Sequence, residues 1–215
     1  MITHIIIHYT GMTKENSAIK KLCDPKSKVS CHYFIRKNGN IHRLVPDLYT
    51  AWHAGKSNWK KKVSLNNNSI GIELHNPGHN TVYKKFSNDQ IYSLIKLLKF
   101  LVKTYKINYK NILGHSDIAP NRKKDPGEKF PWKKLASYNL CLWHNLNEKR
   151  IKKFRKHKID LFNQRIFMNN LSKIGYSKYK KKLVIIAFQR KFRQALIDGN
   201  IDKECFLISK NLLKS

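Results

Sequence analysis

The apolar run Ile5-Ile6-Ile7, which ends at His8, constrains the fold of this 215-residue chain more than any other feature. A continuous apolar run of this kind is typical of a buried strand, and we predict one over residues 2–9. Such a strand would deliver the imidazole of His8 to an open edge of a sheet. A histidine in this position is more often a hydrogen-bonded core residue than a metal ligand, so the run by itself leaves both possibilities open.

The stretch from Gly114 to Gly127 has the composition of a functional site, because it holds a histidine, two acids and three cations. Within it, His115 and Asp125 are side chains that zinc accepts as ligands. Their separation is too long for one helix face, and the two prolines favour a loop that doubles back. A third ligand must come from elsewhere, and His8 is the best candidate. Three protein ligands with a fourth position left for water are typical of a catalytic zinc, one ion per chain.

Six blocks of the sequence are informative as an ordered set: Ile5–Thr10, Ser30–Ile35, Ala51–Ser57, Asn68–Leu74, Gly114–Pro120 and Lys123–Gly127. In this order they resemble the zinc-dependent N-acetylmuramoyl-L-alanine amidases of the type 2 family, which are related to peptidoglycan recognition proteins. The resemblance covers about 125 residues, and six ordered blocks are more specific than any one of them.

The resemblance implies a role for each of five residues. His8, His115 and Asp125 would be the zinc ligands, Glu73 the base that activates zinc-bound water, and Lys123 the cation that stabilises the developing oxyanion. Amide hydrolysis needs such a set, since a nucleophile, a proton carrier and a compensating positive charge must all be supplied. A carboxylate within the apolar run around Glu73 would be costly unless it were paired or used, and a salt bridge to a lysine is the alternative.

Four further residues in these blocks are predicted to bind substrate: His32, Trp52, His53 and Asn68. Two other histidines need a separate interpretation. We expect His42 to be structural, and we keep His75 as a minor alternative ligand, because it stands where the family commonly has an acid or an amide.

The remaining elements are predicted from local signals. Ser87 and Gln90 form a capping box that opens the longest helix, whose apolar face ends near Tyr105. Asn38-Gly39 is the turn signal of a hairpin. The other expected elements are a Thr13-capped helix over 13–22, hairpin strands over 30–35 and 41–45, a surface loop over 58–68, a strand over 69–74 that carries Glu73, and a short strand over 111–113.

The expected fold is an α/β domain with a mixed sheet flanked by helices, followed by a small three-helix domain. We divide the chain into a catalytic domain over 1–138, a helix-rich connector over 139–158 and a helical module over 159–215. Three amphipathic segments form the module, with Gly175 as a helix stop and Asp202 as a helix cap. These segments resemble the peptidoglycan-binding module attached to some of these amidases, and a generic helical extension is the alternative.

The formal net charge of +31 would ordinarily suggest nucleic acid or an anionic surface. The excess is spread along the chain, with 25 cations against 8 acids up to residue 140 and 19 against 5 beyond it. Compositional drift therefore explains the charge as well as a binding function does. A basic nucleic-acid-binding protein would leave the predicted site unexplained. A non-catalytic peptidoglycan receptor is the stronger alternative, although it could dispense with a ligand or base that is present here.

The predicted substrate is peptidoglycan or muropeptides, cleaved between N-acetylmuramic acid and L-alanine, as in wall degradation or recycling in bacteria. We expect a monomer with no transmembrane segment. The protein would act in the cell envelope or periplasm if a leader has been removed, and in the cytoplasm if the chain is complete as given. The four cysteines, Cys23, Cys31, Cys141 and Cys205, are too scattered for a disulfide framework or a zinc site and are expected to be small buried residues.

Overall fold

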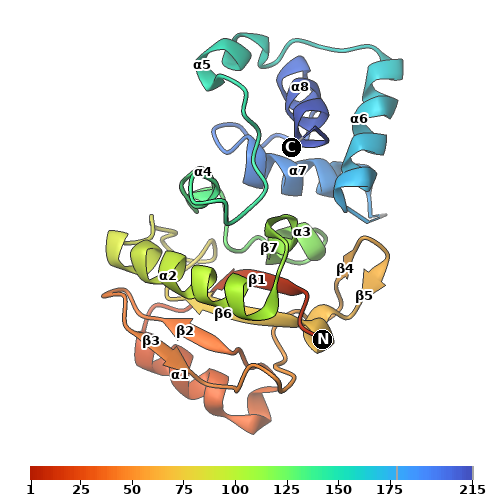
Figure 1. The fold of residues 1–215 in the computed structure, drawn as a ribbon. Coiled ribbons are helices and arrows are strands. Elements are labelled where there is room, and N and C mark those ends of the chain that lie inside the picture. The colour runs from red at the N-terminus through yellow and green to blue at the C-terminus, as the bar shows by residue number, and fades with distance from the viewer. Residues whose placement is uncertain (178, 215) are drawn as a thin grey trace.

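A five-stranded sheet forms the centre of the computed structural model, which describes residues 1–177 and 179–214. Lys178 and Ser215, both in the predicted helical module, lie outside the described residues. The strand order is β3-β2-β6-β1-β7, and helices cover both faces of the sheet (Figure 1). β6 pairs in parallel with β1 and β2, β1 in parallel with β7, and β3 antiparallel with β2. The predicted mixed sheet flanked by helices is confirmed. The strands are β1 (His4–Tyr9), β2 (Tyr33–Ile35), β3 (Ile41–Arg43), β6 (Ser69–Leu74) and β7 (Ile112–Gly114).

The strand predictions agree closely with these bounds. β6 has the predicted limits, β1 begins two residues later than expected, and β7 is shifted by one residue. The hairpin strands are shorter than predicted, and Gly39 in their turn has a φ of 87°. That conformation favours glycine, so the Asn-Gly signal identified the turn correctly.

Alternation along β1 and β6 separates the two faces of the sheet. Ile5, Ile7, Ile70 and Ile72 pack in one hydrophobic cluster with helix α2 (Asn88–Tyr105). The predicted capping box is present, because Ser87 Oγ accepts from the Gln90 backbone N–H and Gln90 Oε1 accepts from that of Ser87, both at 3.1 Å. The opposite face carries the polar residues of the same strands together with Ile6, which belongs to a separate hydrophobic cluster.

Helix α1 (Glu15–Cys23) covers part of that opposite face, where Ala18 packs with Cys31 and Phe34. The prediction that Thr13 caps this helix is wrong. Lys14 holds the cap position and makes no side-chain capping bond. Contacts with the β2–β3 turn take the place of a local cap, since the Glu15 carboxylate accepts from the Lys37 backbone N–H at 2.7 Å.

Residues 58–68 are not the surface loop that their polarity suggested. They form the hairpin of β4 (Asn58–Trp59) and β5 (Lys62–Val63) and a 3-10 turn, η2 (Leu65–Asn68). Trp59 and Leu65 are buried and belong to the hydrophobic cluster of the C-terminal helices. These two apolar anchors hold the segment against the body of the protein despite its charged neighbours.

The chain beyond β7 contains short helices and then three longer ones. The one-turn helix α3 (His115–Ile118) and α4 (Trp132–Ala136) come first. Residues 139–158 are less helical than predicted, because α5 (Glu148–Ile151) and the 3-10 turn η4 (Lys152–Phe154) are the helical elements that the structure describes there. The short 3-10 turns η1 (Pro25–Ser27) and η3 (Tyr109–Asn111) lie earlier in the chain.

Three helices form the C-terminal region, as predicted: α6 (Leu161–Ile174), α7 (Lys181–Phe192) and α8 (Lys203–Leu212). Gly175 ends α6 with a φ of 140°, and Asp202 caps α8 by accepting from the Cys205 backbone N–H at 2.9 Å. Their core is continuous with the face of the sheet opposite α2, since one hydrophobic cluster joins Phe167 and Phe188 to Ile6 of β1. Figure 1 shows these helices stacked over α3 and β7.

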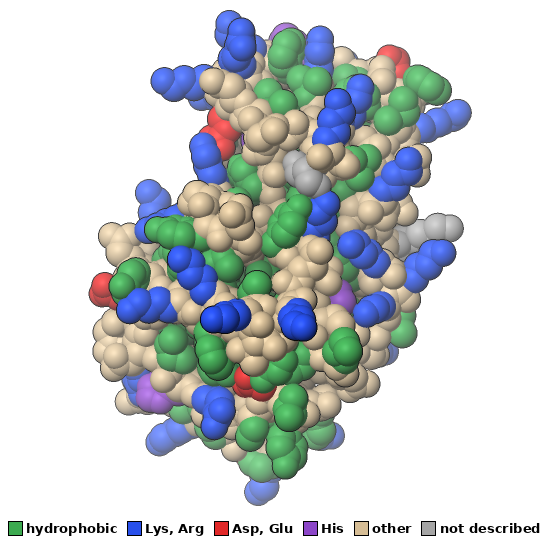
Figure 2. Space-filling model, in the orientation of Figure 1, with side chains coloured by type: hydrophobic (Ala, Val, Ile, Leu, Met, Phe, Trp, Pro, Cys, Tyr) green, Lys and Arg blue, Asp and Glu red, His purple; other side chains and the backbone are tan. Residues whose placement is uncertain are grey.

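The expectations for the cysteines, for membrane-spanning segments and for the spread of charge can be compared with the described residues. Cys31, Cys141 and Cys205 are buried, but Cys23 is exposed at the end of α1, which corrects the expectation for that residue. Within 1–177 and 179–214, no helix combines the length and hydropathy that a membrane span needs. Lysines and arginines are scattered over the whole face seen in Figure 2, as the even spread of charge along the sequence suggested.

Candidate metal centre

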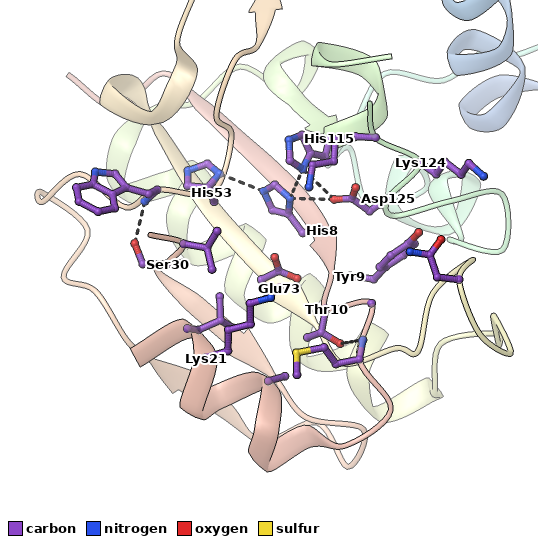
Figure 3. A pocket seen from close by; sticks show the side chains of 18 of the residues that line it. His8, Tyr9, Thr10, Lys21, Ser30, His53, Glu73, His115, Lys124 and Asp125 are labelled. Atoms are coloured by element: carbon purple, nitrogen blue, oxygen red, sulfur yellow. Dashed lines mark hydrogen bonds and ion pairs between the residues drawn. The ribbon is translucent and has the colours of Figure 1, made fainter. Parts of the chain in front are cut away.

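His8 and Glu73 lie side by side on the polar face of the sheet. They are register partners on the parallel strands β1 and β6. Each follows a run of residues that alternate between the two faces, so both side chains point away from α2. Figure 3 shows Glu73 next to His8 in the pocket, with His115 and Asp125 on the far side of the His8 ring.

His115 and Asp125 reach the same point from the segment that follows β7. His115 is the first residue of α3, so the predicted loop begins with one helical turn. The chain then doubles back as expected, and the Ser116 backbone N–H donates to the carbonyl oxygen of Asp125 at 2.9 Å. The Nδ1 atoms of His8 and His115 are 2.9 Å apart, and Asp125 Oδ2 lies 3.0 Å from the first and 3.1 Å from the second. All three residues are buried.

A second set of contacts orients the two imidazoles. His115 Nε2 lies 3.1 Å from the Ala54 carbonyl oxygen, so this nitrogen carries the proton and donates it. His8 Nε2 lies 3.1 Å from His53 Nδ1, and His53 Nε2 lies 3.3 Å from Ser69 Oγ. The Ser69 hydroxyl donates in turn to the Leu65 carbonyl oxygen at 2.6 Å. Partners of this kind fix the tautomer and ring orientation of metal-binding histidines.

The donor set fits a divalent cation. Because the proton of His115 is on Nε2, its Nδ1 presents a lone pair 3.1 Å from a carboxylate oxygen. Two acceptors at that distance repel each other unless a cation or a proton lies between them. Two imidazole nitrogens and one carboxylate oxygen are a ligand set that zinc uses. Among the described residues, His8, His115 and Asp125 are the group of three that can hold a metal ion.

The protonation states favour metal binding at neutral pH. Burial and the neighbouring His115 lower the pKa of His8 to about 4, so this imidazole is neutral. Burial also lowers the pKa of His53 well below its usual value. Burial acts to raise the pKa of Asp125, but its close contacts with His115 and His8 outweigh burial and lower that pKa. Neutral imidazoles and an ionised carboxylate are the forms that bind metal.

Glu73 and Lys123 line the same pocket, which has a volume of about 380 Å³. Burial, helped by the nearby Asp125, raises the pKa of Glu73 to about 8, and Lys123 opposes this rise. Glu73 Oε2 is buried with no hydrogen-bond partner in the described part of the chain. The salt-bridge alternative for Glu73 therefore finds no support. A carboxyl group with a pKa near neutrality in a pocket has the properties of a general base.

The predicted substrate-binding residues divide into two pairs. Trp52 lines the pocket with its side chain 55% exposed, and His53 lines it with both ring nitrogens bonded to protein atoms. His32 and Asn68 are not among the lining residues. The ring nitrogens of His32 bind the Tyr49 carbonyl oxygen and the Gly71 backbone N–H instead.

The other two histidines lie away from the metal ligands. His42 Nε2 accepts from Arg36 Nε at 2.9 Å, which agrees with the structural role expected for it. His75 is not brought to the cluster of His8, His115 and Asp125, so the minor alternative that it is a ligand is wrong. It follows β6 and lines a different surface pocket, together with Lys37 and Ser87.

Three residues that support the site were missed by the sequence analysis. Ser69 extends the contacts of His53, and Gly71 leaves room for the His53 ring, since a Cβ on Gly71 would lie 2.3 Å from His53 Cγ. Arg122 donates to the carbonyl oxygens of Ala54 and Lys56, which fixes the loop that His115 binds. All three lie in or beside blocks that carry the family resemblance. That position in the sequence was the one signal that could have identified them as supporting residues.

Comparison with known proteins identifies the family. Residues 1–128 match the family model described as N-acetylmuramoyl-L-alanine amidase, which is more than half of the chain. The protein belongs to this amidase family. It is 34% identical to the N-acetylmuramoyl-L-alanine amidase AmiD of Escherichia coli, across 98% of this chain and 82% of AmiD. It is 35% identical to the 1,6-anhydro-N-acetylmuramyl-L-alanine amidase AmpD of Haemophilus influenzae, across 63% of this chain and 82% of AmpD.

Solved structures of the amidase family extend the likeness to the whole fold. A complex of E. coli AmiD with anhydro-N-acetylmuramic acid-L-Ala-D-gamma-Glu-L-Lys superposes with a TM-score of 0.87, covering 99% of this chain and 89% of AmiD. AmpDh3 of Pseudomonas aeruginosa, at 28% identity, has a TM-score of 0.86 and covers 99% of this chain and 91% of its own. The predicted fold and the predicted enzyme class, an N-acetylmuramoyl-L-alanine amidase, are confirmed.

Proposed function

We propose that this amidase uses zinc to hydrolyse the bond between N-acetylmuramic acid and L-alanine in muropeptides. The observation that carries the proposal is the convergence of His8 Nδ1, His115 Nδ1 and Asp125 Oδ2, within 3.1 Å of one another, beside Glu73, whose Oε2 has no hydrogen-bond partner among the described residues. When bound to these atoms, zinc would polarise the scissile carbonyl and make water a stronger acid.

In this proposal Glu73 moves the proton and Lys123 stabilises charge. Glu73, in its ionised form, accepts a proton from the attacking water and delivers it to the leaving amine of L-alanine. Lys123 lines the pocket, and its ammonium makes no hydrogen bond or ion pair among the described residues. It is therefore available to stabilise the negative charge that develops on the carbonyl oxygen.

Three features support a muropeptide as the substrate. E. coli AmiD was solved with anhydro-N-acetylmuramic acid-L-Ala-D-gamma-Glu-L-Lys, and AmpDh3 was solved with an anhydromuramic pentapeptide. In this chain the pocket is also lined by Lys21, Arg122 and Lys124, which would attract the carboxylates of a stem peptide. Trp52 offers an exposed aromatic face at the pocket rim, where it could pack against a sugar.

The test is incubation of the purified protein with defined muropeptides, with and without a chelator, followed by mass spectrometry. We expect release of the free stem peptide, loss of release with the chelator, and recovery on addition of zinc. Glu73→Gln should lower the rate by at least about 100-fold, the usual effect of removing a general base.

Glu148→Gln is the matched control, since Glu148 is an exposed carboxylate paired with Lys133 far along the chain from the pocket residues. Its rate should equal that of the wild type. Release that a chelator leaves intact would overturn the zinc proposal, and full activity of Glu73→Gln would remove Glu73 from the role of base.

A further inference from the structure

The C-terminal helices make direct polar contact with the turn that carries the metal ligand His115. The central residue of this contact is Asp117, which is 1% exposed and lies two residues after His115 in α3. Helix α7 packs against α3, and Figure 1 shows α3 between the sheet and the C-terminal helices. The contact therefore joins two parts of the chain that are about 70 residues apart in sequence.

The Asp117 carboxylate accepts three hydrogen bonds from three segments. Oδ2 accepts from the Gly114 backbone N–H at 2.8 Å, at the junction of β7 and α3. Oδ1 accepts from the Tyr176 hydroxyl at 2.8 Å, in the segment after α6. The third donor is the ammonium of Lys191 in α7, 3.3 Å from Oδ2. A buried carboxylate needs partners of this kind, because an unpaired one is strongly destabilising.

Lys191 also holds the junction of β7 and α3, from its position in α7. Its side chain is 4% exposed, and its ammonium also donates to the Ile112 carbonyl oxygen of β7 at 3.3 Å. The ammonium lies 4.2 Å from the centre of the Trp132 ring, at the start of α4. One buried cation thus links β7, α3 and α4 to the C-terminal helices.

These contacts matter because the elements that carry His115 are too short to hold it alone. β7 has three residues and lies at the edge of the sheet, and α3 has four residues. An isolated helical turn is unstable in water, so its position depends on packing. We propose that Lys191 and Tyr176 are positioning residues for the metal centre, acting through Asp117 to hold His115. This inference rests on the proposed zinc site.

The test compares two buried cations of the same helix region. Lys191→Met removes the ammonium beside Asp117, whereas Arg193→Met removes a guanidinium that binds Asp198 and Asp202, away from α3. Both variants leave a buried carboxylate without its cation, so both should lower stability. Zinc affinity of the folded proteins is then measured by competition with a chromogenic chelator. We expect Lys191→Met to bind zinc at least about tenfold more weakly than the wild type, which is the usual effect of losing a residue that orients a metal ligand. The zinc affinity of Arg193→Met should equal that of the wild type.

A milder pair of variants keeps the test decisive if these proteins fold poorly. Tyr176→Phe removes one hydroxyl from Asp117, and Ser209→Ala removes a buried hydroxyl that binds Asn170 in the C-terminal region. Zinc affinity should fall in the first variant and not in the second. Amide hydrogen exchange of the metal-free proteins adds a second measurement, in which Tyr176→Phe should speed exchange over residues 112–119 and Ser209→Ala should not.

Equal zinc affinity and equal exchange of Tyr176→Phe and the wild type would overturn the inference while leaving the proposed zinc site intact. Failure of the wild-type protein to bind zinc would overturn both. Faster exchange over residues 112–119 together with weaker zinc binding, in the Lys191 and Tyr176 variants only, is the result that we expect.

Discussion

At the scale of single residues, the site places an acid where folding alone would not favour one. Glu73 lies between apolar strand residues, its Oε2 has no hydrogen-bond partner in the described part of the chain, and its pKa is about 8. Its pKa in an unfolded chain is about 4.3. The folded protein must therefore take up a proton at Glu73 or bear an unfavourable buried charge. Such a cost is commonly found at functional positions.

The cost of Glu73 predicts that Glu73→Gln stabilises the metal-free protein. Because the pKa of Glu73 is higher in the folded state, wild-type stability falls as pH rises from about 4.5 to about 8. Glutamine does not titrate, so the advantage of the variant should grow over this pH range and stay constant above it. We expect about 1 to 2 kcal/mol at pH 7, after a discount for solvent in the pocket.

Urea denaturation of chelator-treated wild type and variant at pH 5, 7 and 8.5 measures this difference. A gain in unfolding free energy that is the same at all three pH values would contradict the predicted titration of Glu73.

At the scale of elements, strand β6 and the segment around His53 form a unit that supports the metal centre. The His53 ring lies against the backbone of Gly71, and it contacts His8 of the neighbouring strand. β6 thus contributes Glu73 directly and orients His8 through His53. A residue with a side chain at position 71 would be incompatible with this arrangement.

We therefore predict that Gly71→Ala weakens zinc binding by about tenfold or more. The added methyl group would lie 2.3 Å from His53 Cγ, so the ring must move and its contact with His8 must change. Isothermal titration calorimetry with zinc measures the effect. Ile72→Val is the control, since Ile72 faces α2 on the same strand and should cost about 1 kcal/mol of stability without moving His53. Equal weakening in both variants would assign the effect to general destabilisation.

At the scale of the whole molecule, the sheet and the C-terminal helices share one hydrophobic core. Ile6 and Leu113 of the sheet belong to the same cluster as Phe167, Phe188 and Ile208 of α6, α7 and α8. Buried contacts on this scale couple the unfolding of the parts that they join. The role of residues 159–215 in binding peptidoglycan stays a prediction, as does the monomeric state.

The shared core predicts a single unfolding transition for the intact chain. Differential scanning calorimetry should give one peak whose calorimetric and van't Hoff enthalpies agree. The reason is that the C-terminal helices cannot unfold without exposing apolar residues on the face of the sheet opposite α2. Two resolved peaks, one of them assigned by hydrogen exchange to residues 159–214, would show instead that the helical region unfolds independently.

The sequence by itself determined most of the local elements and predicted the residues of the candidate site. Short apolar runs predicted β1 and β6, and the capping box predicted the start of α2, because these signals depend on neighbouring residues only. The family blocks named His8, Glu73, His115, Lys123 and Asp125, and these residues line one pocket. The start of α1 and the burial of Trp59 could not be predicted locally, since distant partners decide both.

Only the tertiary structure decided what holds the site in place. Nothing in the sequence around His53 shows that its ring would rest on Gly71 and contact His8. Likewise, no local pattern links Lys191 to Asp117, 74 residues earlier in the chain. The physical reason is that orientation of a ligand comes from packing and hydrogen bonds between segments far apart in sequence, whereas strands and helix caps come from residues close together.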